Sequence, residues 1–426
     1  MSRILETFLK THSVSTDSRQ IAEGTIYFGL KGERFDGSDF AADALSKGAS
    51  LAIVGKPIGI SDERIIQVED TLQALQELAL AYRRTLKIPF LAITGSNGKT
   101  TTKELVRDVL ATRYHRVHAT KGNLNNHIGV PLTLLSMPSE TDFAVIEMGA
   151  NHQREIADLC SIAEPDMGLI TNIGKAHLEG FGGVEGVFKG KKELFDYVGS
   201  KGGLIFVNRD QENLIRAAEG VQQIQFGLVC DQFTIEVLSS EPYLELRVQV
   251  PGHGAWECRT KMTGAYNAAN IASALSVGLY HQVDAGDAIA AIERYVPDNH
   301  RSQVIQTAKN TVFMDAYNAN PSSLSHALSN LAAQKTSTFF IIGDMRELGE
   351  ESLNEHANIL KHATDLGLKG IAIGEHFYQA GLDMSMTVFS DKPAAIEWLE
   401  AHPPHDKTIL LKGSRGMKLE ELLPFL

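Results

Sequence analysis

A short glycine loop separates a strand pattern from a helix pattern in PFLAITGSNGKTTTKELVRDVLATR, which begins at Pro89. The apolar run FLAIT predicts a buried strand. The segment after the loop predicts a helix, because its apolar residues follow i, i+3 and i+4 spacing: Leu105, Val106, Val109 and Leu110. This order of strand, loop and helix is the repeating unit of α/β folds with parallel sheets.

The loop itself has the residue types of a phosphate-binding site. Backbone N–H groups at a helix N-terminus carry partial positive charge, and glycines let the backbone approach an anion closely. Lys99 would reach the terminal phosphates of a nucleotide, and the Thr100 hydroxyl would bind Mg²⁺. An ordinary glycine turn is the alternative, but Gly-Lys-Thr at a helix start favours phosphate. The expected nucleotide contacts are Gly95, Ser96, Asn97, Gly98, Lys99, Thr100 and Thr101.

Strand and helix patterns continue to alternate along the chain. The runs FLAIT, DFAVIEM, MGLITNI and GLIFVN, each followed by a helical pattern, predict a parallel sheet covered on both faces. Residues 222–260 alternate more and predict an antiparallel appendage. We therefore expect an α/β protein of three domains: a small N-terminal domain (1–87), a central mostly parallel-sheet domain with the phosphate loop (88–301), and a Rossmann-like C-terminal domain (302–426).

Two further polar residues follow predicted strands of the central domain. Glu147 ends the run DFAVIE, and His177 lies in the glycine-rich segment LITNIGKAHLEGFG. Ligands of open α/β sheets bind at the carboxyl ends of the strands, so Glu147 is well placed to hold Mg²⁺ beside Thr100. Each residue alone has an ordinary alternative, as a solvated strand-end acid and a surface loop histidine.

Composition argues against several classes of partner. The 426 residues include 40 Lys and Arg against 52 Asp and Glu, a formal charge of −12, which disfavours nucleic acid and anionic membranes. No apolar run approaches the length of a membrane span, and the N-terminus lacks a signal-peptide pattern. Three widely spaced cysteines predict reduced thiols. We expect a cytoplasmic protein, a monomer, whose partners are small molecules.

Segments along nearly the whole chain resemble the Mur ligase family, ATP-dependent amide-forming ligases of peptidoglycan synthesis. The phosphate loop of that family is the short form G-[ST]-x-G-K-[TG], which GSNGKT matches. Further resembling segments are TDSRQIAEGTIYFGLKGERFDGSDFAADALSKGA, GNLNNHIGVPLTLL, EMGANHQREI, TNIGKAHLEGFGG, KGKKELF, GAYNAANIASAL and LLKGSRGMKLEELL. The segments DAYNANPSS and GDMRELG resemble the branch of the family that adds D-alanyl-D-alanine rather than a single amino acid.

The resemblance implies a reaction between UDP-N-acetylmuramoyl-tripeptide, D-alanyl-D-alanine and ATP. ATP would phosphorylate the tripeptide carboxylate, and the dipeptide amine would then displace phosphate from the acyl phosphate. Two Mg²⁺ ions are implied, one held by Thr100 and Glu147, the other by His177 and a carbamylated Lys191. With Lys99, the residues Glu147, His177 and Lys191 are the expected catalytic set. Nearby Lys189 and Lys192 are alternative positions for the modified lysine.

The same resemblance implies the remaining binding residues. Asn267 and Asn270 would contact adenine, although a buried helix amide is the alternative for Asn270. Arg301 and Asp315 would contact phosphate and ribose. The uridine diphosphate part would bind Asp17, Ser18, Arg19, Lys31 and Gly32, and the dipeptide side would involve Asn318, Asn320, Lys412 and Arg415.

Three other functions are compatible with parts of the sequence. A sister ligase of the family would have the same ATP site and a different amine substrate, and DAYNANPSS argues against it. A P-loop kinase or GTPase would have four residues between the loop glycines, whereas here there are two. A non-catalytic nucleotide-binding protein would not need Glu147, His177 and Lys191 together.

Overall fold

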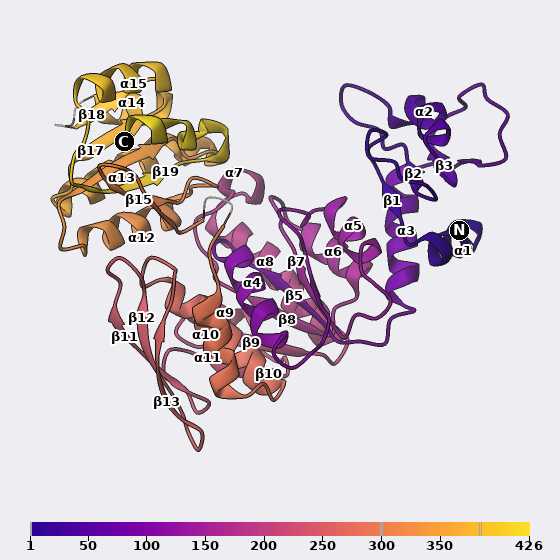
Figure 1. The fold of residues 1–426 in the computed structure, drawn as a ribbon, viewed down its shortest axis with the longest axis horizontal. Coiled ribbons are helices and arrows are strands. Elements are labelled where there is room, and N and C mark those ends of the chain that lie inside the picture. The colour runs from indigo at the N-terminus through magenta and orange to yellow at the C-terminus, as the bar shows by residue number, and fades with distance from the viewer. Residues whose placement is uncertain (1, 299–300, 383, 385) are drawn as a thin grey trace.

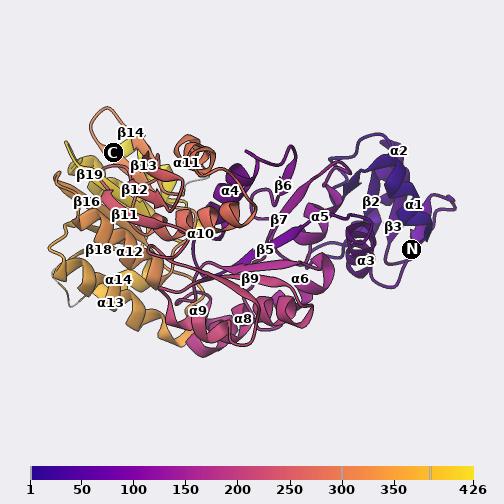
Figure 2. The ribbon, with the colours of Figure 1, turned by 90° about the horizontal axis from the view of Figure 1, so that it is seen from below.

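The computed structural model describes residues 2–298, 301–382, 384 and 386–426. It forms three α/β units, and in both views the N-terminal and C-terminal units lie at opposite ends of the central unit (Figure 1, Figure 2). The expected α/β class with three domains is confirmed. Across the residues described, no helix has the length and apolar character that crossing a membrane requires. Cys160, Cys230 and Cys258 are free thiols.

The N-terminal unit is a parallel sheet with helices around it. Its strands pair in the order β1 (Val14–Ser15), β2 (Ile26–Phe28), β3 (Leu51–Val54) and β4 (Ile65–Gln67). Its helices are α1 (Ser2–Thr11), α2 (Ala41–Ser46) and α3 (Thr71–Arg83), with a 3₁₀ turn at Gly37–Phe40. Helix α3 also joins the unit to the next one, because Tyr82 Oη donates to Met137 O at 2.8 Å and Arg83 Nε to Ala163 O at 2.9 Å.

The central unit is built on a six-stranded, all-parallel sheet. The strand order is β10 (Gln223–Phe226), β9 (Leu204–Asn208), β8 (Met167–Ile170), β5 (Phe90–Thr94), β7 (Phe143–Glu147) and β6 (Val117–Ala119). One group of its helices is α4 (Lys99–Leu110), α10 (Asn267–Tyr280) and α11 (Ala285–Arg294). The other helices are α5 (Gly129–Leu135), α6 (Glu155–Ala163), α7 (Leu178–Phe181), α8 (Val184–Ser200) and α9 (Glu212–Ala217).

Both faces of this sheet are buried, as its unbroken apolar strands predict. Successive side chains of a strand point to opposite faces. In β5, Phe90 and Ala92 belong to the core cluster that includes α5, α6 and α8, while Leu91 and Ile93 belong to the cluster of α4, α10 and α11. The carboxyl end of β5 therefore emerges at the sheet edge between two helical layers, which is where the phosphate loop begins.

The antiparallel appendage is smaller than the sequence predicts. It consists of β11 (Thr234–Ser239), β12 (Glu245–Val250) and β13 (Gly254–Arg259). The run IQFGL, expected to belong to it, instead supplies β10, which pairs parallel with β9 from Gln223 to Phe226. That expectation was wrong because pairing with a neighbouring strand, and not the local alternation of residues, decides which sheet a short strand joins.

The C-terminal unit is a six-stranded sheet with helices on its faces. Its strand order is β14 (Gln303–Gln306), β15 (Thr311–Met314), β19 (Thr408–Lys412), β16 (Thr338–Gly343), β17 (Gly370–Ile373) and β18 (Thr387–Phe389), with β14 antiparallel and the other pairs parallel. Its helices are α12 (Pro321–Ala332), α13 (Ser352–Asp365), α14 (Glu375–Gly381) and α15 (Lys392–Ala401). Short 3₁₀ segments are Gly349–Glu351, Arg415–Met417 and Leu419–Phe425.

Candidate active site

A cavity of about 1040 Å³ lies between the central and C-terminal units. The central unit lines it with the phosphate loop, the segments after β7 and β8, and the start of α10. The C-terminal unit contributes the segment after β15, the start of α12 and Lys412 at the end of β19. Apart from the start of α10, these parts lie at or after the carboxyl ends of strands, where α/β sheets bind ligands.

The phosphate loop is held by close contacts that leave no room for larger residues. Gly98, with φ of +76°, caps α4, and a Cβ there would lie 2.5 Å from Asn270 Oδ1. A Cβ on Gly95 would lie 2.0 Å from Thr171 Oγ1. Asn97 N donates to Asn172 Oδ1 at 3.0 Å, and Asn172 Nδ2 donates back to Asn97 O at 2.9 Å. The loop is therefore preformed.

Lys99 begins α4 and folds back over the loop. Its Nζ donates to Gly95 O at 2.7 Å and to Ser96 O at 3.3 Å. Burial lowers the pKa of Lys99 to about 8; Glu147 opposes that shift and Arg301 adds to it. An ammonium in this position is short of counter-charge, so it favours an arriving phosphate.

Glu147 is the buried carboxylate of the site. It is 1% exposed at the end of β7, and its Oε1 accepts from Asn125 Nδ2 at 2.7 Å. Its Oε2 is buried and has no hydrogen-bond partner among the described residues. Thr100, also buried, lines the same cavity. A free carboxylate oxygen and a hydroxyl fit Mg²⁺, which typically takes one or two protein ligands and completes its shell with phosphate and water.

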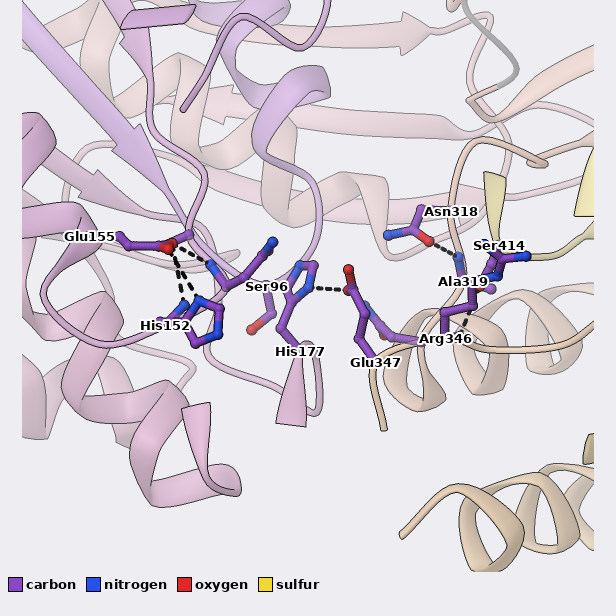
Figure 3. Close-up of polar contacts among 12 residues, drawn as sticks. Ser96, His152, Glu155, His177, Asn318, Ala319, Arg346, Glu347 and Ser414 are labelled. Carbon is purple, nitrogen blue, oxygen red and sulfur yellow. Dashed lines mark hydrogen bonds and ion pairs between the residues drawn. The ribbon is translucent and has the colours of Figure 1, made fainter. Parts of the chain in front are cut away.

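No group of three or more His, Cys, Asp or Glu side chains in the described part of the chain forms a ready metal cage. His177, with φ of +53°, caps α7, and its Nδ1 makes a short contact with Glu347 Oε2. Figure 3 shows these side chains pointing toward each other from the central and C-terminal units. The hydrogen bond from His177 lowers the pKa of Glu347. This pairing leaves His177 Nε2 available, which is how many metal-binding histidines are oriented.

Lys191 lies on the buried side of α8. It is 1% exposed, its Nζ donates to Ala150 O at 3.2 Å, and it lies 5.0 Å from the centre of the Phe181 ring. Burial, and to a smaller degree Lys99, holds the pKa of Lys191 well below the usual lysine range. Lys191 is not among the residues that line the cavity, although Ala150 is.

The two lysines beside Lys191 have different surroundings. Lys189 is exposed, and Lys192 is half-buried and pairs with Asp196 one turn along α8. Of the three candidates, Lys191 alone is buried beside a cavity-lining carbonyl.

The two asparagines of α10 form a hydrogen-bonded chain under the phosphate loop. Thr102 Oγ1 donates to Asn270 Oδ1 at 3.1 Å, Asn270 Nδ2 to Asn267 Oδ1 at 2.8 Å, and Asn267 Nδ2 to Thr263 O at 2.7 Å. Both asparagines line the cavity, but these bonds already satisfy much of their capacity. Supporting the loop is therefore a role the geometry gives them besides any adenine contact.

The C-terminal unit brings four expected residues to the cavity close to one another. Asp315 Oδ2 accepts from Lys412 Nζ at 2.5 Å, and Lys412 Nζ also donates to Asn318 O at 3.2 Å. Asn320 Nδ2 reaches across to Asn97 Oδ1 of the phosphate loop at 2.8 Å. Arg301 also lines the cavity and stacks at 3.5 Å over the ring of Tyr317.

Besides Gly95 and Lys191, six expected residues do not line this cavity. Arg415 is exposed and pairs with Glu420 at 2.6 Å. The other five are the residues expected to bind the uridine diphosphate part: Asp17, Ser18, Arg19, Lys31 and Gly32. Arg19 pairs with Asp17 at 2.8 Å, and its hydrogen bonds lower the pKa of Asp17 to about 2.

Sequence reasoning missed several residues of the site. Asn125, which holds Glu147, lies within GNLNN, and its two neighbouring asparagine positions gave no local reason to choose it. Tyr266 and His326 stack across the cavity with ring centres 6.2 Å apart. Lys175 Nζ binds Glu355 Oε1 at 2.5 Å between the units. Such partners are far apart in sequence, so no spacing pattern announces them.

Each of the three units matches a family model of known proteins. Residues 10–83 match the Mur ligase family catalytic domain, residues 93–278 the Mur ligase middle domain, and residues 300–415 the Mur ligase glutamate ligase domain. The UDP-N-acetylmuramoyl-tripeptide–D-alanyl-D-alanine ligase of Escherichia coli (strain K12) is 35% identical, over 96% of this chain and 92% of that protein. This chain belongs to the Mur ligase family.

Other members of the Mur ligase family align over similar lengths. The enzyme of the same name from Bacillus subtilis (strain 168) is 33% identical, over 97% of this chain and 92% of that protein. A crystal structure of MurF from Acinetobacter baumannii has a TM-score of 0.88 at 33% identity, with 97% of this chain and 92% of that chain covered. The MurF ligase of Thermotoga maritima in complex with ADP has a TM-score of 0.87 at 26% identity, with 98% and 97% covered.

Proposed function

We propose that this Mur ligase joins D-alanyl-D-alanine to UDP-N-acetylmuramoyl-tripeptide with ATP, in peptidoglycan synthesis. The observation that carries the proposal is the cavity in which the phosphate loop faces Asn318 and Lys412 of the C-terminal unit. Support comes from the relatives that align with 96–97% of the chain, at 33–35% identity, and are named for this reaction. The chain would act in the cytoplasm as a monomer, with domains 1–87, 88–301 and 302–426.

The residues of the cavity fit a reaction in two steps. Lys99 and the loop amides bind the β- and γ-phosphates, so that a tripeptide carboxylate oxygen attacks the γ-phosphorus in line and ADP leaves. The amine of the dipeptide then attacks the acyl carbon, phosphate leaves, and the new amide loses a proton. The chain contributes position and charge to both steps, because phosphoryl transfer asks for little covalent chemistry from the protein.

Two magnesium ions would neutralise the charge that builds up between carboxylate and phosphate. Thr100 and the free oxygen of Glu147 fit one of them. His177, oriented by Glu347, and a carbamate on Lys191 would hold the other. The low pKa of Lys191 supports this carbamate, because a neutral amine adds CO₂ and releases a proton to give an anionic oxygen ligand.

The binding residues complete the proposal. Asn267 and Asn270 would contact adenine as well as support the loop, and Arg301 and Asp315 would contact phosphate and ribose. The dipeptide would lie beside Asn318, Asn320 and Lys412, all of which line the cavity, with Arg415 approaching only if its unit moves. The uridine diphosphate part would bind Asp17, Ser18, Arg19, Lys31 and Gly32 in the N-terminal unit.

Phosphate release by the purified protein tests this function. The reaction is run with ATP and magnesium, and with UDP-N-acetylmuramoyl-tripeptides that carry either diaminopimelate or lysine at the third position. We expect release only when a tripeptide and D-alanyl-D-alanine are both present. Release with a single amino acid in place of the dipeptide would identify a sister ligase, and release without any amine would exclude an amide ligase.

A further inference from the structure

A buried lysine lies behind the metal-binding carboxylate. Lys103, in the second turn of α4, is 1% exposed, and its Nζ donates to Thr120 O at 2.7 Å. The same Nζ lies 4.0 Å from Glu147 Oε2 and 3.5 Å from Glu104 Oε1. Lys103 is therefore a buried cation close to Glu147, in addition to Lys99, whose ammonium Glu147 also favours.

Lys103 and Glu147 both donate hydrogen bonds to the same residue, Thr120. The carbonyl oxygen of Thr120 accepts a hydrogen bond from Lys103 Nζ. Its hydroxyl oxygen, Oγ1, accepts one from the backbone N–H of Glu147 at 2.9 Å. Asn125 occupies Glu147 Oε1, so the free oxygen is the one that faces Lys103. A separation of 4.0 Å is too long for a hydrogen bond, so the ammonium offers charge without occupying that oxygen.

The charge of Lys103 affects both the stability of the buried Glu147 carboxylate and the binding of a divalent cation to it. A buried carboxylate without a counter-charge is costly, and a neighbouring ammonium offsets that cost. A divalent cation that binds the same oxygen is repelled by the ammonium, with an energy that is large where water is scarce. The other carboxylate near Lys103, on Glu104, has a side chain that is 13% exposed, and its Oε2 accepts a hydrogen bond from Tyr295 Oη at 2.7 Å. Glu147 is therefore the partner that depends more on Lys103.

We propose that Lys103 is a positioning residue that balances the charge of Glu147 in the metal-free protein and weakens divalent-cation binding there until nucleotide phosphates arrive. The proposal rests on the proposed function only in that Glu147 is taken as a metal ligand. Metal would then enter with the nucleotide, because the phosphates supply the negative charge that Lys103 cancels in the empty site.

Manganese binding without nucleotide tests the proposal, since carboxylate sites for magnesium also accept Mn²⁺. Free Mn²⁺ is measured by electron paramagnetic resonance during titration of the full-length protein. We expect Lys103→Met to bind Mn²⁺ at least about tenfold more tightly than the unchanged protein, because one charge at this distance is removed. Lys121→Met, which removes an exposed lysine next to Thr120, is the matched control and should leave binding unchanged.

Thermal unfolding in EDTA provides the second readout. Lys103→Met should lower Tm by leaving Glu147 unbalanced, and the double variant Lys103→Met with Glu147→Gln should recover much of that loss. The double variant Lys103→Met with Glu104→Gln should not recover the lost Tm. Neither measurement needs turnover, so both remain informative if the ligase reaction is a different one.

Two results would overturn the proposal. One is Mn²⁺ binding by folded Lys103→Met that is no tighter than that of the unchanged protein. The other is a loss of Tm in Lys103→Met that Glu147→Gln does not relieve, which would make Lys103 a packing residue. If Lys103→Met does not fold, recovery of the fold in the double variant with Glu147→Gln supports the proposal, and failure to recover it counts against it.

Discussion

At the scale of single residues, Lys191 carries the most specific chemical expectation. Its amine is buried in α8 with a pKa held well below the usual range, and the proposed function predicts a carbamate on it. Lys191→Ala should lose nearly all turnover, and added acetate or formate should restore part of it by supplying a carboxylate in the vacated space. Phosphate release with all three substrates measures both effects.

The neighbouring lysines serve as controls for that substitution. Lys189 is exposed and Lys192 pairs with Asp196, so Lys189→Ala and Lys192→Ala should keep most activity. A dead Lys189→Ala or Lys192→Ala beside an active Lys191→Ala would place the modified lysine elsewhere.

We expect Lys99 to make ATP binding sensitive to pH. Its pKa in the free protein is about 8, so its ammonium is present below that pH and is lost above it. Since phosphate favours the charged form, affinity for a non-hydrolysable ATP analogue should fall as pH rises through about 8, by up to about tenfold per pH unit. Titrations from about pH 7 to about pH 9.5 measure it. Lys99→Arg, which stays charged, should flatten the profile, and an equal slope in both proteins would contradict this role.

The sequence could place at the site those residues that belong to a local motif. It could not place residues whose roles depend on partners far away in the chain. Lys99 and Thr100 follow from the loop, and Glu147 follows from its place at a strand end. Lys103 follows the loop by only a few positions, yet its role depends on Thr120 and Glu147, which reach it through the fold. Burial of a charged side chain is a tertiary property, so spacing alone cannot reveal it.

At the scale of elements, the strand–loop–helix unit depends on Gly98. Its φ of +76° and the contact with Asn270 both exclude a side chain. Gly98→Ala should abolish binding of the ATP analogue and cost more than the roughly 1–2 kcal/mol that left-handed backbone alone costs an L-residue. Calorimetric ATP titration and denaturant unfolding measure the two effects.

Gly220 is a matched control for Gly98. It has the same φ of +76°, and a Cβ there would meet nothing within 4 Å. Gly220→Ala should lower the free energy of unfolding only by the cost of left-handed backbone for an L-residue, and it should leave nucleotide binding unchanged. Equal losses of stability in the two variants would mean that the contact with Asn270 is unimportant.

The elements themselves were largely readable from the sequence. Unbroken apolar runs gave β5, β7, β8 and β9, because strands buried on both faces carry apolar residues throughout. The assignment of IQFGL failed, and the antiparallel edge strand β14 was not anticipated, since both depend on which strand lies alongside. Local sequence largely determines whether a strand forms. Which strand it pairs with depends on the rest of the fold.

At the scale of the whole molecule, the two outer units stand in different relations to the cavity. The C-terminal unit already lines it and is held by Asn97 with Asn320 at 2.8 Å and by Lys175 with Glu355 at 2.5 Å. The described N-terminal unit contributes none of the lining residues and is joined to the central unit through α3. The reacting carboxylate belongs to the substrate expected to bind that unit, so we expect the N-terminal unit to approach the phosphate loop when that substrate binds.

Small-angle scattering should therefore respond more to one ligand than to the other. An ATP analogue alone should change the profile little, because the C-terminal unit already faces the loop. The UDP-tripeptide with the analogue should reduce the radius of gyration toward the roughly 22 Å expected of a compact chain of this length. Arg19→Ala, which removes an expected contact of the uridine diphosphate part, should reduce that compaction at a fixed ligand concentration. Compaction with the ATP analogue alone, or identical profiles in all samples, would show that the N-terminal unit is not the part that closes.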